Sequence, residues 1–133
     1  MNPPSILIVD DDENLRRLLQ AAFHENGFRV QTATGGREAL DRLQIEKPQC
    51  MLLDLEIPGL KGLDLLQALH KDPPAPNLVI MVLSATSDIE LKLACLAAGA
   101  HEYLVKPVDV RELVARVQRF LRMVEDFRHA APP

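Results

Sequence analysis

Aromatic side chains are scarce in this 133-residue chain, which has no Trp, one Tyr and four Phe. Hydrophobic residues nevertheless make up 47% of the sequence, so a buried core must be built mainly from Leu, Ile, Val and Ala. A chain of this length is enough for one compact domain and too short for two. We expect one domain over residues 1–128, with residues 129–133 as a tail or the start of a linker.

Excess positive charge, long apolar runs and numerous cysteines are also missing. The formal net charge is −4, and a surface that binds phosphate backbones needs clustered cations, so we expect no direct nucleic-acid binding. No stretch approaches the roughly 20 apolar residues of a membrane-spanning helix, and the first four residues lack the features of a secretion signal. Cys50 and Cys95 each lie in an apolar segment, as buried thiols do in a reducing compartment. We therefore expect a cytoplasmic protein without membrane contact.

Short apolar runs alternate with longer amphipathic stretches along the chain. The runs predict strands at residues 6–9, 28–33, 50–55, 78–83 and 103–105. The amphipathic stretches predict helices over 13–25, around 39–43, over 63–70 and 88–98, and from 110 onward. Fivefold strand–helix alternation is typical of an open parallel sheet covered by helices on both faces. We predict a doubly wound α/β sandwich of the flavodoxin-like type, with strand order 2-1-3-4-5 and five helices.

The polar residues that follow the apolar runs carry the chemistry. The ligand site of such a sheet lies outside the carboxyl ends of its strands. This sequence places there three carboxylates, a hydroxyl and an ammonium: Asp10, Asp11, Asp54, Ser84 and Lys106. Acids after a first strand can also be helix caps, an interpretation that suits Asp12 and Glu13 better. Asp54 interrupts an apolar central strand, where a carboxylate without a partner is costly.

This set of groups predicts phosphoryl transfer to Asp54. Three crowded carboxylates need a cation, and all-oxygen ligands suit Mg²⁺. Beside such an ion, a carboxylate can attack a phosphoryl group and form an acyl phosphate. The transfer then depends on positioning and on neutralising the phosphoryl oxygens. Mg²⁺ would contact one oxygen, Lys106 a second, and the Ser84 hydroxyl a third together with nearby backbone N–H groups.

Four motifs make the sequence similar to the receiver domain of bacterial two-component response regulators. They are Ile-Leu-Ile-Val-Asp-Asp at 6–11, Leu-Leu-Asp-Leu-Glu-Ile-Pro-Gly at 52–59 with Gly62, Val-Leu-Ser-Ala at 82–85, and Tyr-Leu-Val-Lys-Pro at 103–107. The resemblance extends from Ile6 to about Met123 and implies a CheY-like fold. It also implies a signalling domain that catalyses only its own phosphorylation and dephosphorylation. The phosphoryl donor would be the phosphohistidine of a sensor histidine kinase or of a phosphotransfer protein.

The resemblance assigns roles to individual residues. Asp54 is implied to be the phosphoacceptor, Ser84 to turn its hydroxyl toward the phosphoryl group, and Lys106 to contact another phosphoryl oxygen. A cis peptide bond is implied before Pro107. The implied ligands of Mg²⁺ are Asp10, Asp11, Asp54 and the backbone carbonyl of Glu56.

Three further positions bear on switching and on the lifetime of the phosphoryl group. Tyr103 stands where the family carries an aromatic that moves inward on activation, after Ser84 has moved to the phosphoryl group. A packed strand aromatic is the alternative interpretation of Tyr103. Glu56 and Thr86, two residues after Asp54 and Ser84, flank the path of an attacking water and would tune the lifetime of the phosphoryl group.

The helix expected over residues 88–98 carries two apolar stripes. Its leucine-rich stripe suits the sheet. The second stripe would either face a partner or be no more than a tolerated surface leucine among alanines. The first comprises Ile89, Leu93, Leu96 and Ala97, and the second comprises Leu91, Ala94, Cys95 and Ala98. We expect the face formed by the fourth helix, fifth strand and fifth helix to bind a second copy of the chain or an output partner.

Two other functions compete with this interpretation. A phosphohydrolase of the haloacid dehalogenase type also uses an aspartate, a hydroxyl and a lysine. Such enzymes carry the nucleophile on the first strand with an Asp two residues later, whereas here Asp54 lies on the third strand and Glu56 follows it. The second alternative is a receiver-like binding module that works without phosphorylation.

Overall fold

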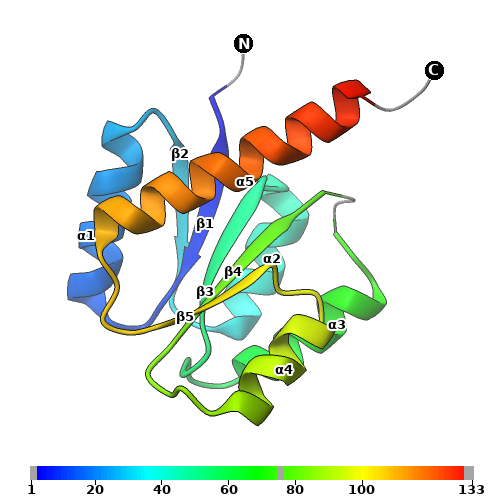
Figure 1. Ribbon diagram of the computed structural model, residues 1–133. Helices are drawn as coiled ribbons and strands as arrows, with labels where there is room; N and C mark the ends of the chain where they lie inside the picture. The colour runs from blue at the N-terminus through cyan, green and yellow to red at the C-terminus, as the bar shows by residue number, and fades with distance from the viewer. Residues whose placement is uncertain (1–2, 75–76, 131–133) are drawn as a thin grey trace.

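The computed structural model of the chain describes residues 3–74 and 77–130 (Figure 1). The five strands are β1 (Ser5–Val9), β2 (Arg29–Ala33), β3 (Cys50–Asp54), β4 (Val79–Ser84) and β5 (Glu102–Val105). The five helices are α1 (Glu13–Glu25), α2 (Gly36–Glu46), α3 (Gly62–Lys71), α4 (Ile89–Ala97) and α5 (Val110–Ala130). The strands form one parallel sheet in the order β2-β1-β3-β4-β5, which confirms the predicted fold class and strand order.

The element bounds differ from the predicted ones by a few residues. The largest difference is at α2, which begins at Gly36, three residues before the first apolar marker at Ala39. Apolar periodicity marks only the buried turns of a helix, so it does not detect a first turn that begins with glycine. Residues 129 and 130 of the expected tail belong to α5, and residues 131–133 lie outside the described residues.

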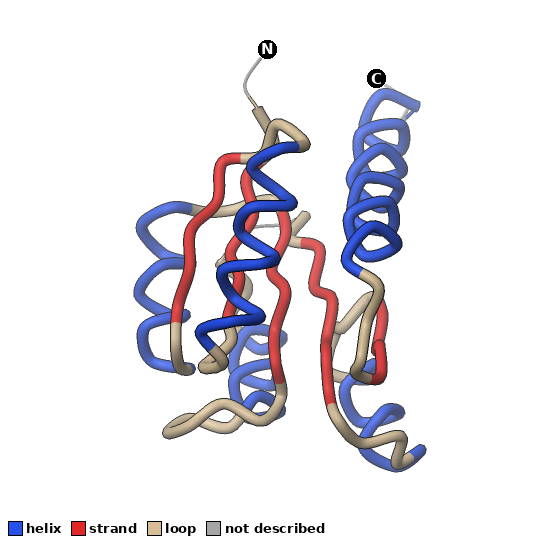
Figure 2. Tube along the Cα trace, turned by 90° about the vertical axis from the view of Figure 1, so that its left-hand side faces the viewer, coloured by secondary structure: helices blue, strands red, loops and turns tan. Residues whose placement is uncertain are grey.

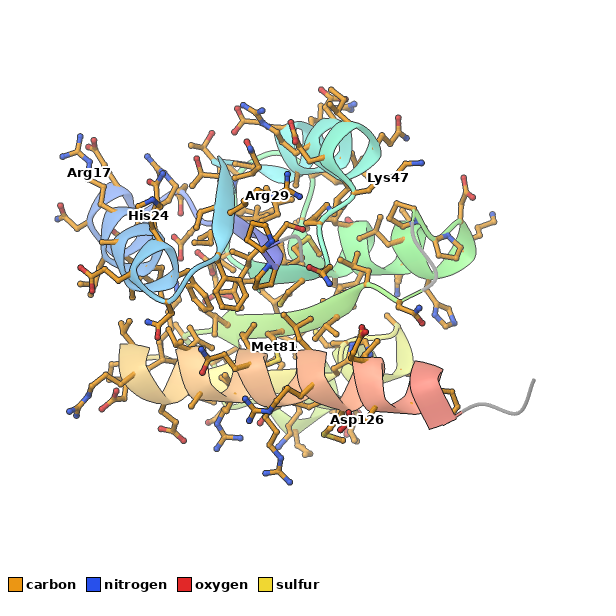
Figure 3. The ribbon with its side chains drawn as sticks, turned by 90° about the horizontal axis from the view of Figure 1, so that it is seen from above. Arg17, His24, Arg29, Lys47, Met81 and Asp126 are labelled. Atoms are coloured by element: carbon orange, nitrogen blue, oxygen red, sulfur yellow. The ribbon has the colours of Figure 1, made fainter. Side chains whose placement is uncertain are left out.

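Two hydrophobic layers sandwich the sheet. Even-numbered residues of β1, such as Ile6 and Ile8, pack with α1 and α5, whereas Leu7 and Val9 pack with α2, α3 and α4. Figure 3 shows α5 lying along one face of the sheet beside Met81 of β4. The central strands β3 and β4 are buried along their whole length, because helices cover both faces. Cys50 and Cys95 are free, buried thiols, as predicted.

Helix α4 has both expected apolar stripes, but their directions are the reverse of the predicted ones. Cys95 and Ala98 are buried and Leu91 packs against the core, whereas Leu93 is 53% exposed and Ile89 is also exposed. The small side chains of the buried stripe allow α4 to lie close to the sheet, where larger leucines would hold it away. The leucine-rich stripe of α4 is therefore left on the surface.

The loops that follow the strands gather at one end of the molecule, opposite the start of β1 and the end of α5 (Figure 2). At this end the loop after β3 packs tightly on the start of α3. A Cβ atom at Gly62 would lie 2.7 Å from Leu55 Cδ2 and 2.8 Å from Leu55 Cα. Within the described residues, no helix combines the length and the apolar character needed to span a bilayer.

Replacing Gly62 by Ala tests this close packing. We expect Gly62→Ala to lower the free energy of unfolding by roughly 1–3 kcal/mol, because the new methyl group meets the backbone of Leu55 as well as the end of its side chain, and the backbone cannot move aside easily. Urea denaturation measures the change. Gln67→Ala, on the exposed face of the same helix, should change stability by less than about 0.5 kcal/mol. Equal stability of the two variants would contradict the close contact between Gly62 and Leu55.

Candidate functional site

Two buried carboxylates stand side by side at the strand ends. Asp10 directly follows β1 and Asp54 is the last residue of β3, and the two strands pair with Val9 opposite Leu53. Asp10 is 1% exposed and Asp54 is 3% exposed. Two adjacent buried carboxylates repel each other and are costly unless a cation or several donors accompany them.

Lys106 supplies that cation. Its Nζ lies 3.3 Å from Asp54 Oδ2 and 3.5 Å from Asp10 Oδ2. The lysine follows β5, and its backbone N–H donates to the carbonyl of Ser84 at 2.8 Å, which anchors it to the end of β4. The Lys106–Pro107 peptide bond is cis, in agreement with the expectation from the resemblance.

Backbone N–H groups hold the other oxygens of the two carboxylates. The N–H of Asp12 donates to Asp10 Oδ1 at 2.9 Å, and the N–H of Glu56 donates to Asp54 Oδ1 at 3.0 Å. Each acid therefore has one oxygen fixed by its own loop and one directed at Lys106. The Asp12 side chain itself caps α1 by accepting from the N–H of Asn14, so the capping interpretation is correct for Asp12.

Asp11 joins the two buried acids to form a candidate metal site. Carboxylate oxygens of Asp10, Asp11 and Asp54 all lie within 4.8 Å of one another, and Asp11 is exposed to solvent. Three carboxylates face a single ammonium, so negative charge remains in excess. Hard oxygen ligands in this number suit a divalent cation such as Mg²⁺ or Ca²⁺.

The electrostatics of the site shift the pKa values of Asp54 and Lys106. Burial raises the pKa of Asp54 to about 6, and the nearby charge of Asp10 also raises it, while the Glu56 N–H and Lys106 act in the opposite direction. Burial alone would lower the pKa of Lys106, but the attraction of Asp54 and Asp10 raises it overall. Lys106 is therefore a fixed positive charge, and Asp54 is a carboxylate that a nearby cation would stabilise in its ionised form.

Ser84 and Glu56 form the other half of the site. The hydroxyl of the buried Ser84 donates to Glu56 Oε2 at 2.8 Å, and the N–H of Ala85 donates to Glu56 Oε1 at 2.6 Å. The sequence predicts a ligand role for the Glu56 backbone carbonyl and an effect of Glu56 on phosphoryl lifetime, but it does not predict these two side-chain contacts. The sequence signal for this contact is an acid two residues beyond the end of β3, the strand that pairs with the one ending in Ser84.

Tyr103 lies in the inward position. It is 7% exposed, and its hydroxyl donates to the carbonyl of Thr86 at 2.6 Å. The N–H of Thr86 donates in turn to Ser84 Oγ at 3.2 Å. A continuous hydrogen-bonded path therefore runs from Glu56 through Ser84 and Thr86 to Tyr103.

Strand alternation divides the site into two sides. Successive side chains of a strand point to opposite faces of the sheet, so Asp10 and Asp54 share the face covered by α1 and α5. Ser84 and Tyr103 belong to the face covered by α3 and α4. Only at the carboxyl edge, beyond the strand ends, can groups from both faces meet one ligand.

The raised pKa of Asp54 predicts a pH-dependent stability in metal-free solution. Because the folded protein binds this proton more tightly than the unfolded chain, stability falls as the pH rises from about 4 to about 6. Asp54→Asn removes the buried charge, so it should raise the free energy of unfolding by up to about 3 kcal/mol at neutral pH and have little effect below about pH 4.

Urea denaturation with a chelator at several pH values measures this difference. Asp41→Asn, at an exposed position on α2, is the control and should show no such pH dependence. Equal stability of Asp54→Asn and the wild type at neutral pH would contradict the assigned burial cost.

Comparisons with known proteins agree with this geometry. The family model of the response regulator receiver domain matches residues 6–118. The chain is 41% identical over 120 residues to the transcriptional regulatory protein PrrA of Mycobacterium tuberculosis, covering 90% of this chain and 50% of PrrA. It is 39% identical over 119 residues to the phosphate regulon transcriptional regulatory protein PhoB of Rhizobium meliloti, covering 90% of this chain and 52% of PhoB.

A crystal structure shows the same similarity. A CheY-like response regulator receiver domain protein from Methanospirillum hungatei superposes with a TM-score of 0.87 at 28% identity, covering 93% of this chain and 98% of that one. The chain spans about half the length of the curated relatives it matches. With a family match over most of its length and these relatives, the chain belongs to the receiver domains of two-component response regulators, which are signalling domains and not enzymes.

Proposed function

We propose that Asp54 is the phosphoacceptor and that it receives its phosphoryl group from a histidine kinase or a phosphotransfer protein. A carboxylate oxygen of Asp54 attacks the phosphorus, the new P–O bond forms, and the P–N bond of the phosphohistidine breaks. The electron pair of that bond leaves with the imidazole nitrogen. The observation that carries the proposal is the convergence of Asp54 with Asp10, Asp11 and Lys106 at one sheet edge.

We propose Mg²⁺ as the ion of the acidic cluster. Its ligands would be carboxylate oxygens of Asp10, Asp11 and Asp54, together with the backbone carbonyl of Glu56. The ion would neutralise charge on a phosphoryl oxygen during transfer. Support comes from the all-oxygen composition of the cluster and from the excess of carboxylates over ammonium groups.

Lys106 and Ser84 would bind the remaining phosphoryl oxygens. The Lys106 ammonium already lies 3.3 Å from Asp54 Oδ2, so it can contact an oxygen of a group attached there. Ser84 and the N–H of Ala85 are donors at the end of the neighbouring strand. Glu56 and Thr86 flank this region, which supports their proposed influence on the lifetime of the phosphoryl group.

The signal would travel from Ser84 to Tyr103. A phosphoryl group adds about two negative charges, and Ser84 is hydrogen-bonded to Thr86, which is hydrogen-bonded to Tyr103. A change at Ser84 therefore alters the packing between β5 and the loop before α4. We infer that Ser84 and Tyr103 form the switch and that the face of α4, β5 and α5 is its output.

The remaining parts of the proposal concern the whole protein. We infer that residues 1–128 form the receiver domain and that residues 129–133 are a tail or the start of a linker. The two free, buried cysteines support a cytoplasmic location. Because PrrA and PhoB are about twice as long as this chain, an output domain in the same protein is also part of the proposal.

Asp54→Asn tests phosphorylation directly. With acetyl phosphate and Mg²⁺, the wild-type chain should gain the mass of one phosphoryl group, because the Asp54 carboxylate attacks phosphorus and acetate leaves. Asp54→Asn should gain none, and Asp41→Asn, at an exposed carboxylate, should behave as the wild type. Intact-protein mass spectrometry measures the change. An unmodified wild type would favour the phosphorylation-independent alternative, and modification of Asp54→Asn would assign the acceptor elsewhere.

The exposed apolar side chains next to Tyr103 lead to a second prediction. Ile89, Leu93 and Leu96 of α4 lie on the surface together with Val105 of β5. The same region carries charges of both signs, such as Glu90 and Lys92, which can pair across a twofold interface between identical patches. We propose that a second copy of the chain binds this face in the phosphorylated state.

Analytical ultracentrifugation tests the proposed dimer. Beryllofluoride, a phosphoryl analogue, should convert the wild type with Mg²⁺ from monomer toward dimer, and Leu93→Glu should remain monomeric because it places charge in the apolar patch. Ile45→Glu, at an exposed apolar position of α2, is the matched control and should dimerise normally. A wild type that stays monomeric with beryllofluoride bound would refute self-association through this face.

A further inference from the structure

The donors expected to bind the phosphoryl group are already in use. The Ser84 hydroxyl donates to one oxygen of the Glu56 carboxylate at 2.8 Å, and the Ala85 N–H donates to the other at 2.6 Å. Glu56 thereby presents two negatively charged oxygens to the same pair of donors that a phosphoryl group would need. Among the contacts of the described residues, this is the only side chain accepting from both groups.

The two uses of these donors exclude each other. A serine hydroxyl has one hydrogen to donate, and a backbone N–H has one. Ser84 is fully buried, so no second acceptor can reach it from solvent while Glu56 is in place. Hydrogen bonds to ionised acceptors are also the stronger ones, so a carboxylate is an effective competitor for a phosphoryl oxygen.

We propose that the Glu56 carboxylate is an internal competitor of the phosphoryl group, occupying Ser84 and Ala85 until phosphorylation of Asp54 displaces it. This inference rests on the proposed function, and it adds a regulatory role for a side chain of the same site. Glu56 acts as a positioning residue: it holds Ser84 while the site is empty and limits how readily the site accepts a phosphoryl group.

The cleft beside Glu56 has room for its displaced carboxylate. Glu56 is exposed, and it lines an open cleft of about 640 Å³ between the loops that follow β3 and β4. Lys61 lines the same cleft and provides a positive charge there. Displacement therefore needs only a rotation of the Glu56 side chain toward solvent, while its backbone N–H stays bonded to Asp54.

The competitor also accounts for the inward position of Tyr103. Ser84 is held at the carboxyl edge by Glu56, and the path through Thr86 connects Ser84 to the Tyr103 hydroxyl. The arrangement that a phosphoryl group would impose on Ser84 is thus partly imposed by Glu56 beforehand. Phosphorylation would exchange one acceptor for another at Ser84 and add charge at Asp54.

Beryllofluoride binding at saturating Mg²⁺ tests the competition. Glu56→Ala removes the competitor and should tighten beryllofluoride binding by about tenfold. In the wild type, binding must first break the charge-assisted hydrogen bonds to Glu56, and about tenfold corresponds to roughly one such bond. Glu56→Gln, which keeps an acceptor oxygen but loses the charge, should lie between Glu56→Ala and the wild type. Glu25→Gln, at an exposed acid at the end of α1, is the control and should bind as the wild type.

The fluorescence of the chain offers a direct signal, since Tyr103 is the only tyrosine and there is no tryptophan. Titrations at low and at high salt separate competition from long-range repulsion, because screening removes the latter. If Glu56→Ala still binds beryllofluoride more tightly than the wild type at high salt, the result supports the proposal. If the difference disappears at high salt, or if Glu56→Ala binds no more tightly than the wild type at any salt concentration, the proposal is overturned.

The rate of labelling by acetyl phosphate is the second measurement. Glu56→Ala should acquire its phosphoryl group on Asp54 faster than the wild type, again by about tenfold. If the wild type is phosphorylated and Glu56→Ala is no faster, the competition is refuted while the proposed function stands. If neither protein is phosphorylated, the proposed function itself fails.

Discussion

The site depends on one electrostatic arrangement, in which a single ammonium holds two buried carboxylates that would otherwise repel each other. Asp10 and Asp54 come from neighbouring strands, and Lys106 reaches both from a third. One oxygen of each acid is fixed by a backbone N–H, so both side chains keep a defined direction. Negative charge still exceeds positive charge once Asp11 is included, and this excess prepares the edge for a divalent cation.

The sheet separates the charged groups from the groups proposed to form the switch. Asp10 and Asp54 belong to the face covered by α1 and α5, and Ser84 and Tyr103 belong to the face covered by α3 and α4. A group attached to Asp54 extends beyond the strand ends, where donors of the second face can contact it. This geometry explains how a reaction on one side of a rigid sheet can affect hydrogen bonds on the other.

Tight packing restricts the loop after β3, which carries Glu56. Gly62 lies against Leu55, so the residues after Asp54 have little freedom, and the backbone of Glu56 is further held by its bond to Asp54. The Glu56 side chain, in contrast, is exposed and lines an open cleft. The proposed exchange of acceptors at Ser84 would therefore need only the Glu56 side chain to move, while the loop that carries it stays in place.

Local pattern in the sequence was enough for the fold and for the main site residues. Hydrophobic periodicity defined the strands and helices, and parallel strands necessarily bring Asp10, Asp54, Ser84 and Lys106 to one edge. Hydrophobic periodicity could not predict which side of α4 faces the sheet, because both of its stripes are apolar. Only the packing in the folded protein decides that the stripe of smaller side chains is buried and the leucine-rich stripe is exposed. The contact of Glu56 with Ser84 and Ala85 was likewise decided by tertiary structure, since it joins residues 28 and 29 positions apart.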